Sequence, residues 1–157
     1  MDKITPFLWY DGNAEEAANL YVSIFKNSKI VKIRRSGDGG PGPKGSVMGV
    51  DFELEGRSFI AFNGGPHFTF NPAVSLFVNC DTQQEVDELW DKLVAGGKPV
   101  QCGWLTDKFG VSWQIIPKAL GEMMNDPDPA KSSRVVQAMM KMIKIDVAGL
   151  TKAYNGN

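Results

Sequence analysis

A chain of 157 residues provides about one domain's worth of polypeptide, and its 43% hydrophobic and 22% charged residues are typical of a globular protein. Seventeen Lys and Arg against eighteen Asp and Glu give a net charge of −1, which excludes the strongly basic surface that a nucleic-acid partner requires. No segment approaches the roughly 18 consecutive apolar residues of a membrane span, and the first six residues lack the apolar core of a signal peptide. We therefore expect a cytoplasmic protein without nucleic-acid or membrane partners, in which Cys80 and Cys102 stay reduced.

The first half of the chain predicts four strands and one helix. Residues 3–10 are rich in β-branched and aromatic side chains and run into a turn, which is typical of a strand. Asn13 is the expected cap of a helix that follows, because apolar residues recur at helical spacing as far as Phe25. Alternating or β-rich segments predict strands over 29–35, 46–55 and 57–63. The Gly- and Pro-rich segments 36–45 and 63–66 are expected to be loops.

The second half repeats this order with an offset of 69 residues. The repeat is carried by apolar pairs, namely Phe7 and Leu76, Trp9 and Val78, Ala17 and Val86, Leu20 and Leu89, and Tyr21 and Trp90. The expected elements are a strand over 73–80, a helix from Asp81 or Thr82 to about 95, and strands over 98–102, 104–108 and 111–116. After Pro117 the pattern becomes helical, with starts at Asp128-Pro129 and at Asp146.

These elements predict an α+β fold in a single domain, 1–157. Two paired β-α-β-β-β modules, at about 3–65 and 72–117, are expected to form a curled, mixed eight-stranded sheet, followed by a helical tail over 118–157.

Three segments resemble the PhnB-like branch of the vicinal oxygen chelate superfamily, which holds glyoxalase I, extradiol dioxygenases and bleomycin resistance proteins. They are ITPFLWYDGNAEEA at 4–17, FNGGP at 62–66 and QCGWLTDKFG at 101–110. Members of the branch are often labelled demethylubiquinone 3-methyltransferase. The resemblance therefore leaves open whether the chain is an enzyme, as a methyltransferase or through metal-dependent lyase or dioxygenase chemistry.

The resemblance also places the superfamily's four metal ligands on this chain, at Ile4, Ile60, Ala73 and Gln114. Only Gln114 has a ligand atom, whereas a divalent metal needs three or more donors, so we expect no metal there. His67, the only histidine, is interpreted as a loop residue, with a metal or base role as the minority alternative. The glycines of 37–42 are followed by a strand and not by a helix, so they predict no nucleotide cradle and no cofactor.

Residues that share strand parity with these four ligand positions are expected to line the concave face of the sheet, and this face would hold a small organic ligand. They are Leu8, Ser58, Phe62, Ser75, Phe77, Ser112, Gln114 and Ile116. The alternative is that these side chains fill one another and leave no pocket. Trp104 could line the pocket mouth or simply pack, while Trp9, Trp90 and Trp113 are expected in the core.

Other reactive side chains receive structural interpretations. Cys102 is expected to be a packed thiol and not a nucleophile, Asp107 and Lys108 to be solvated turn charges, and Asp51 and Glu53 to lie on a wet strand face.

The leading hypothesis is therefore a homodimeric protein that binds a small molecule in a metal-free cup, with no catalytic residue assigned. The subunit contact is predicted at Met139, Met140 and Met142.

Overall fold

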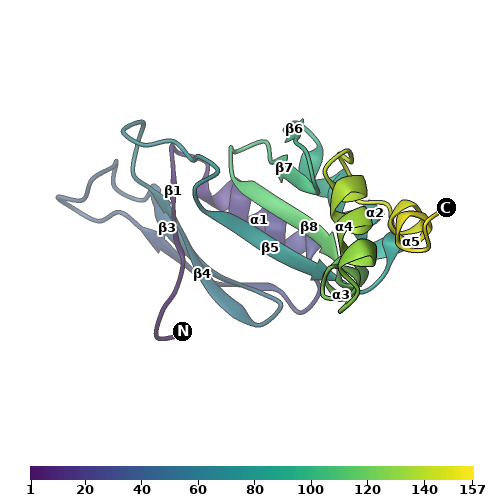
Figure 1. Cartoon of the computed structure of the whole chain (residues 1–157). Helices are drawn as coiled ribbons and strands as arrows, with labels where there is room; N and C mark the ends of the chain where they lie inside the picture. Colours follow the sequence, from purple (N-terminus) through teal and green to yellow (C-terminus); the bar gives the residue numbers. More distant parts are fainter. The chain divides into compact units, whose positions relative to one another are not determined.

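The computed structural model describes all 157 residues, which divide into two compact units, Met1–Phe70 and Asn71–Asn157 (Figure 1). Each unit repeats the β-α-β-β-β order, which confirms the predicted α+β fold. The strands hydrogen-bond into two four-stranded sheets, one in each unit, and not into one eight-stranded sheet. The reason is that strands pair only with strands of their own unit. The first strand of each unit, β1 or β5, pairs only with the last strand of that unit, β4 or β8. That the units act as a single domain stays a prediction.

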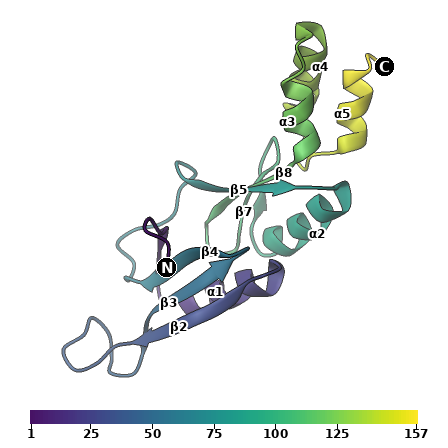
Figure 2. The same cartoon turned by 90° about the horizontal axis from the view of Figure 1, so that it is seen from below.

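The first unit places one helix against one face of its sheet. Its elements are β1 (Phe7–Tyr10), α1 (Ala14–Ile24), β2 (Lys29–Arg35), β3 (Val47–Leu54) and β4 (Arg57–Asn63). The strand order is β1-β4-β3-β2, with β1 parallel to β4 and the other pairs antiparallel. Figure 2 shows α1 running along one side of the sheet, where Tyr21 meets Phe52 and both are buried. The opposite face of this sheet carries no helix of its own unit, and we call it the open face of the first sheet.

The second unit has the same plan. Its strands and helix are β5 (Ser75–Cys80), α2 (Gln83–Val94), β6 (Lys98–Pro99), β7 (Trp104–Thr106) and β8 (Ser112–Pro117), in the sheet order β5-β8-β7-β6. Thr82 caps α2 as predicted, because its hydroxyl accepts a hydrogen bond from the Glu85 backbone N–H at 3.1 Å. The face away from α2 is the open face of the second sheet.

The cap of α1 differs from the prediction. Asn13 stands at the N-cap position, but its side chain makes no capping hydrogen bond. Instead Asn63, at the end of β4, accepts from the Ala14 N–H at 2.9 Å. A residue distant in sequence therefore satisfies the helix end and ties α1 to the sheet.

The C-terminal tail forms three helices, α3 (Lys118–Met124), α4 (Pro129–Met139) and α5 (Val147–Tyr154). Asp128 and Asp146 cap α4 and α5 as the sequence predicts. Helix α3 lies inside the predicted helical tail, although no separate start was predicted for it. Figure 2 shows α4 and α5 side by side, beyond the end of β8. None of the helices is long and apolar enough to cross a membrane.

A shared core joins the tail to the second sheet. Ile116 of β8 packs in one buried cluster with residues of the tail, namely Leu120, Val135, Ile145 and Leu150. The Gln83 side chain donates to the Ile145 carbonyl and accepts from the Val147 N–H, at 3.0 and 2.7 Å. The tail is therefore an integral part of the second unit.

Backbone bonds reinforce this attachment next to the sheet. The N–H groups of Cys102 and Gly103 donate to the carbonyls of Met142 and Ile143, both at 2.8 Å. Gly103 has φ +83°, and a Cβ there would lie 2.7 Å from Ile116 Cδ1, so only glycine fits this close approach.

Candidate functional site

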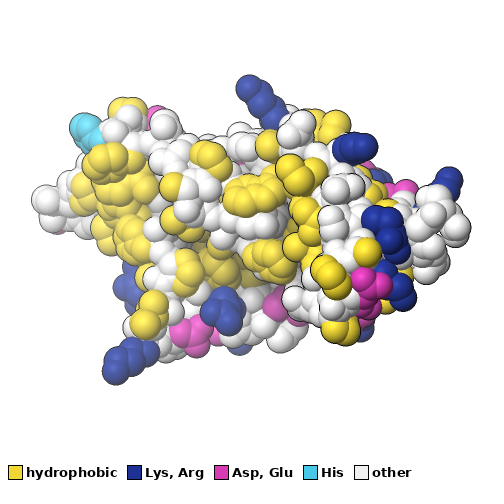
Figure 3. Space-filling model, in the orientation of Figure 1, with side chains coloured by type: hydrophobic (Ala, Val, Ile, Leu, Met, Phe, Trp, Pro, Cys, Tyr) yellow, Lys and Arg dark blue, Asp and Glu magenta, His cyan; other side chains and the backbone are white.

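The open face of the second sheet gathers most of the predicted ligand-binding residues. Strand pairing aligns Phe77 with Gln114 and Gln114 with Trp104, which makes one row across three strands. Ser75, Ser112 and Thr106 form the adjacent row in the same way. The face therefore presents an amide between two aromatic rings, beside a line of hydroxyl groups. Figure 3 shows hydrophobic side chains exposed over β5 and β8.

Gln114 is the central polar group of this face. Its Nε2 donates to the Ser75 hydroxyl at 2.9 Å, and its Oε1 accepts no hydrogen bond from the protein. The amide is thus oriented by Ser75 and keeps an unused acceptor. Phe77 beside it is 59% exposed, Trp104 is half-buried and Ser112 is buried.

Ile116 shares this face by parity but cannot line a pocket. It is buried by the tail helices, in the cluster with Leu120 and Ile145. The tail therefore covers the end of the open face at β8, and the accessible part is centred on Gln114.

The open face of the first sheet is aromatic. Phe62 lies between Phe7 and Trp9, with ring centroids 5.2 and 5.3 Å away, and Phe68 lies 5.0 Å from Trp9. The Trp9 indole donates to the Gly65 carbonyl at 2.9 Å, so the loop after β4 folds over this ring. Ser58 is on the same face, where its hydroxyl accepts from the Asp2 N–H at 3.1 Å. Figure 3 shows hydrophobic side chains gathered beside the single histidine.

The predicted place of Leu8 on the concave face is wrong, and so is that of Trp9 in the core. Leu8 pairs with Ala61, which is buried on the α1 side, whereas Trp9 pairs with Phe62 on the open face. The physical reason is a one-residue difference between the modules. Two residues, 11 and 12, separate β1 from the α1 cap position, but only Asp81 separates β5 from Thr82. The offset of 69 holds for the helices, while the strands are related by 70, which inverts their parity.

Two carboxylates that were expected to be solvated are buried and bonded. Asp51 accepts from Arg34 through both oxygens, at 3.2 and 2.6 Å, and this bond raises the pKa of the Arg34 guanidinium. Asp107 is only 2% exposed and accepts from the backbone N–H groups of Phe109 and Val111 and from the Trp113 indole. Asp107 therefore organises the hairpin between β7 and β8.

The donor set at the superfamily's metal positions does not fit a metal ion. Ile60 and Ala73 have no ligand atoms, Ile4 lies before β1 begins, and no three His, Cys, Asp or Glu side chains come together elsewhere. His67 lies exposed in the loop after β4. The glycine-rich segment 37–45 returns directly into β3, with Gly45 N–H bonded to the Ser36 carbonyl, so no helix N-terminus meets a nucleotide there.

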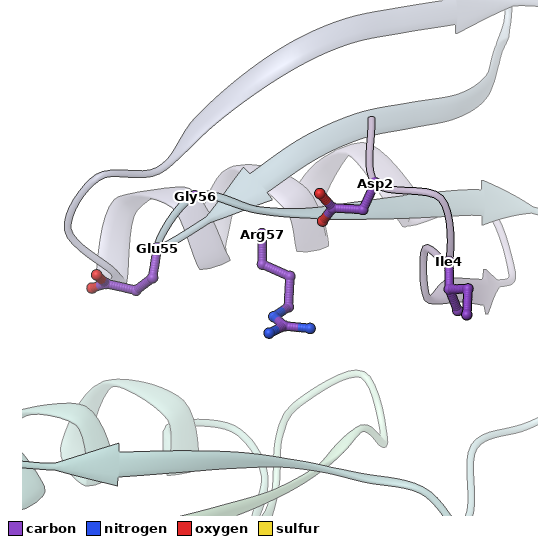
Figure 4. A pocket seen from close by; sticks show the side chains of 5 residues that line it. All are labelled: Asp2, Ile4, Glu55, Gly56 and Arg57. Carbon is purple, nitrogen blue, oxygen red and sulfur yellow. The ribbon is translucent and has the colours of Figure 1, made fainter.

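A shallow polar hollow of about 310 Å³ lies at the β3–β4 turn (Figure 4). It is lined by Asp2, Ile4, Glu55, Gly56 and Arg57, and the Arg57 side chain lies between those of Glu55 and Ile4. None of the predicted ligand-binding residues lines it.

The two cysteines should differ in reactivity. Burial raises the pKa of the Cys80 thiol to about 12, with the nearby carboxylates of Glu85 and Asp81 acting in the same direction. At pH 8 only about one Cys80 thiol in ten thousand is then the reactive thiolate. Cys102 is partly exposed. With a disulfide reagent at pH 8 we expect one thiol to react in the native protein and the second only after unfolding. Rapid labelling of Cys80 in folded Cys102→Ser protein would contradict this.

The duplicated β-α-β-β-β fold, with an open face on each of its two sheets, agrees with the module order that the sequence resemblance implied. Residues 2–116 match the model of the 3-demethylubiquinone-9 3-methyltransferase family, and the chain belongs to this PhnB-like family.

Two solved structures illustrate the similarity. The PhnB protein of Bacillus cereus, described as a candidate 3-demethylubiquinone-9 3-methyltransferase, is 41% identical, with a TM-score of 0.68 over 74% of this chain and 99% of its own. A Pseudomonas aeruginosa protein is 23% identical, with a TM-score of 0.62 over 74% of this chain and 98% of its own, and shows the fold alone. Among proteins with curated descriptions, none matches.

Proposed function

We propose that this protein binds a small organic molecule on the open face of the second sheet, without a metal ion, in the cytoplasm. The observation that carries the proposal is the row of Phe77, Gln114 and Trp104, in which an oriented amide with an unused acceptor lies between two accessible aromatic rings. An apolar surface with a few placed polar groups is the usual composition of a small-molecule site.

A thermal-shift screen tests this proposal. The compounds are divalent metals, S-adenosylmethionine, quinones and aromatic antibiotics, because any ligand that binds the native state raises the melting temperature. We expect a shift with an organic compound and none with metals. A shift with metals alone would reject metal-free binding. A shift with S-adenosylmethionine alone would favour the methyltransferase alternative.

Replacing Gln114 with Ala should weaken the binding of a compound found in the screen. Loss of one hydrogen bond costs roughly 0.5–1.5 kcal/mol to a neutral partner and up to about 3 kcal/mol to a charged one, which is up to about a hundredfold in affinity. Ser112→Ala should show a smaller loss. Gln84→Ala, on the exposed side of α2, is the matched control. Unchanged affinity in Gln114→Ala and Ser112→Ala, at unchanged melting temperature, would place the site elsewhere.

The protein is also proposed to be a homodimer. The four-stranded sheets leave open faces and edges that favour a partner, and Met140 and Ile143 of the tail are 62% and 54% exposed. Met139 and Met142, which were predicted in the contact, pack instead against the tail core. Light scattering at micromolar concentration should give about twice the chain mass of 17.2 kDa. A mass of one chain would reject the dimer.

The alternative function is an enzyme, as the description of the Bacillus cereus relative suggests. It is favoured by the family match, while the residues at the metal and glycine-loop positions supply neither metal ligands nor a nucleotide cradle. Transfer of a labelled methyl group from S-adenosylmethionine to a demethylated quinone would support it.

A further inference from the structure

We infer that the open face of the second sheet binds an aromatic acid, with the aromatic ring over Gln114 between Phe77 and Trp104 and the anionic group at Lys98. This inference rests on the proposed function and names the class of its ligand. It is carried by strand register, hydrogen bonding and the distribution of charge on this face.

Strand register sets the width of the space above Gln114 between Phe77 and Trp104, which we call the slot. Phe77 and Trp104 flank Gln114 on neighbouring strands, and strands lie about 4.8 Å apart, so the two aromatic residues stand roughly 9.6 Å apart. A ring above Gln114 would lie about 4.8 Å from each of them, within the range of about 4.5–7 Å at which aromatic pairs attract. The slot thus fits one ring layer.

The floor of the slot supplies an oriented acceptor. The Ser75 hydroxyl fixes the amide by accepting from its Nε2, and the Oε1 atom is left without a protein donor. A ring substituent that donates a hydrogen bond, such as a hydroxyl or an amine, can use this atom.

The strand positions on the open face of the second sheet carry positive charge only. The strand positions that face this side are Ser75, Phe77, Asn79, Lys98, Trp104, Thr106, Ser112, Gln114 and Ile116. Lys98 is the only charged residue among them, is exposed and forms no ion pair. It pairs with Thr106, which places it diagonally from Trp104, within reach of a long side chain. A carboxylate on the ring would therefore meet a cation, and none of these strand positions carries an acid.

The test is calorimetric titration of the full chain at low ionic strength with three probes: naphthoate, its neutral analogue naphthamide, and cyclohexanecarboxylate, which keeps the charge without the aromatic ring. We expect naphthoate to bind most tightly. Phe77→Ala and Trp104→Ala should each lower its affinity at least about fivefold, and Lys98→Gln about two- to fivefold, with the Lys98 effect lost at high salt.

Two control variants locate the site. Phe68→Ala removes an exposed ring from the first unit, and Lys92→Gln removes an exposed cation from α2, on the other side of the second sheet. Neither should change naphthoate affinity. Binding lost in Phe68→Ala and kept in Trp104→Ala would overturn the inference.

The outcomes separate this inference from the proposed function. Equal affinity for naphthoate and naphthamide, unaffected by Lys98→Gln, would overturn the acid class while metal-free binding stands. Absence of binding by all three probes would also overturn the inference, whereas the proposed function fails only if the broader thermal-shift screen finds no organic ligand.

Discussion

Asp107→Ala should destabilise the protein by about 3–5 kcal/mol, because three N–H groups lose their acceptor and two of them, those of Val111 and the Trp113 indole, are buried. The carboxylate bonds to the N–H groups of Phe109 and Val111 at 2.9 and 3.0 Å and to the Trp113 indole at 2.9 Å. Hydrogen bonds to a charged acceptor contribute about 1.5–3 kcal/mol each, and the Val111 N–H and the Trp113 indole N–H would stay buried without a partner. At about 2–4 °C per kcal/mol, the melting temperature should fall by roughly 10 °C.

Asp107→Asn should lie between wild type and Asp107→Ala. The amide keeps one acceptor oxygen, but its NH₂ group faces either the indole N–H or the backbone N–H groups. Two donors then face each other, and that hydrogen bond is lost. Urea unfolding followed by tryptophan fluorescence measures these changes, with Asp91→Ala on the exposed side of α2 as the control. If Asp107→Ala were as stable as Asp91→Ala, the hairpin would not depend on this carboxylate.

Ile145→Ala should cost about 2–5 kcal/mol, the range for truncating a fully buried aliphatic side chain. Ile145 is 0% exposed and packs in the cluster that includes Ile116 of the sheet and Leu150 of α5. Ile143, two residues earlier, is 54% exposed, so Ile143→Ala should change stability by no more than about 0.5 kcal/mol.

The Ile145→Ala variant also tests whether the tail and the second sheet unfold together. Circular dichroism reports the helices. Tryptophan fluorescence reports the sheets and α2, with Trp104 of β7 and Trp113 of β8 among its four sources. Because Ile116 lies in β8, we expect both signals to move to lower urea concentration by the same amount. Helices that melt alone, with the fluorescence transition unchanged, would show that the tail is separable.

Strand alternation and turn glycines were enough to predict most of the fold. The strands Lys29–Arg35 and Arg57–Asn63 have the predicted bounds, and Asp128 and Asp146 cap their helices as predicted. The tail was predicted to be helical from residue 118, but α3 was not assigned as a separate helix, because it follows β8 directly and Pro117 at its cap position offers no side-chain hydrogen bond. The sequence therefore carried no start signal for it.

The candidate site was predicted unevenly, for a geometric reason. On the second sheet, strand parity placed Ser75, Phe77 and Gln114 on one face, as the register has them. Trp104, which was left open between lining a pocket mouth and packing, pairs with Gln114 on the same face. On the first sheet the same counting failed, because one additional turn residue before α1 moves Leu8 to the helix side. Comparing the distance from each strand to its helix cap could have revealed this shift.

The burial of Asp107 could not be read from charge patterning. Its partners are backbone groups and an indole that meet only when the hairpin closes. The one local signal was the residue type, because an Asp side chain in a turn often accepts from the backbone N–H two residues later, as Asp107 does from Phe109.

The central claim, a metal-free ligand site on the open face of the second sheet, is tested most directly by side-chain nuclear magnetic resonance. An organic compound that raises the melting temperature is titrated into ¹⁵N-labelled protein, and the Gln114 amide and the indole signals are followed, each assigned from its variant. We predict that the Gln114 and Trp104 signals shift at saturation while that of Trp113, buried on the α2 side, shifts least. A shift confined to Trp9, or metal-dependent shifts only, would contradict the account.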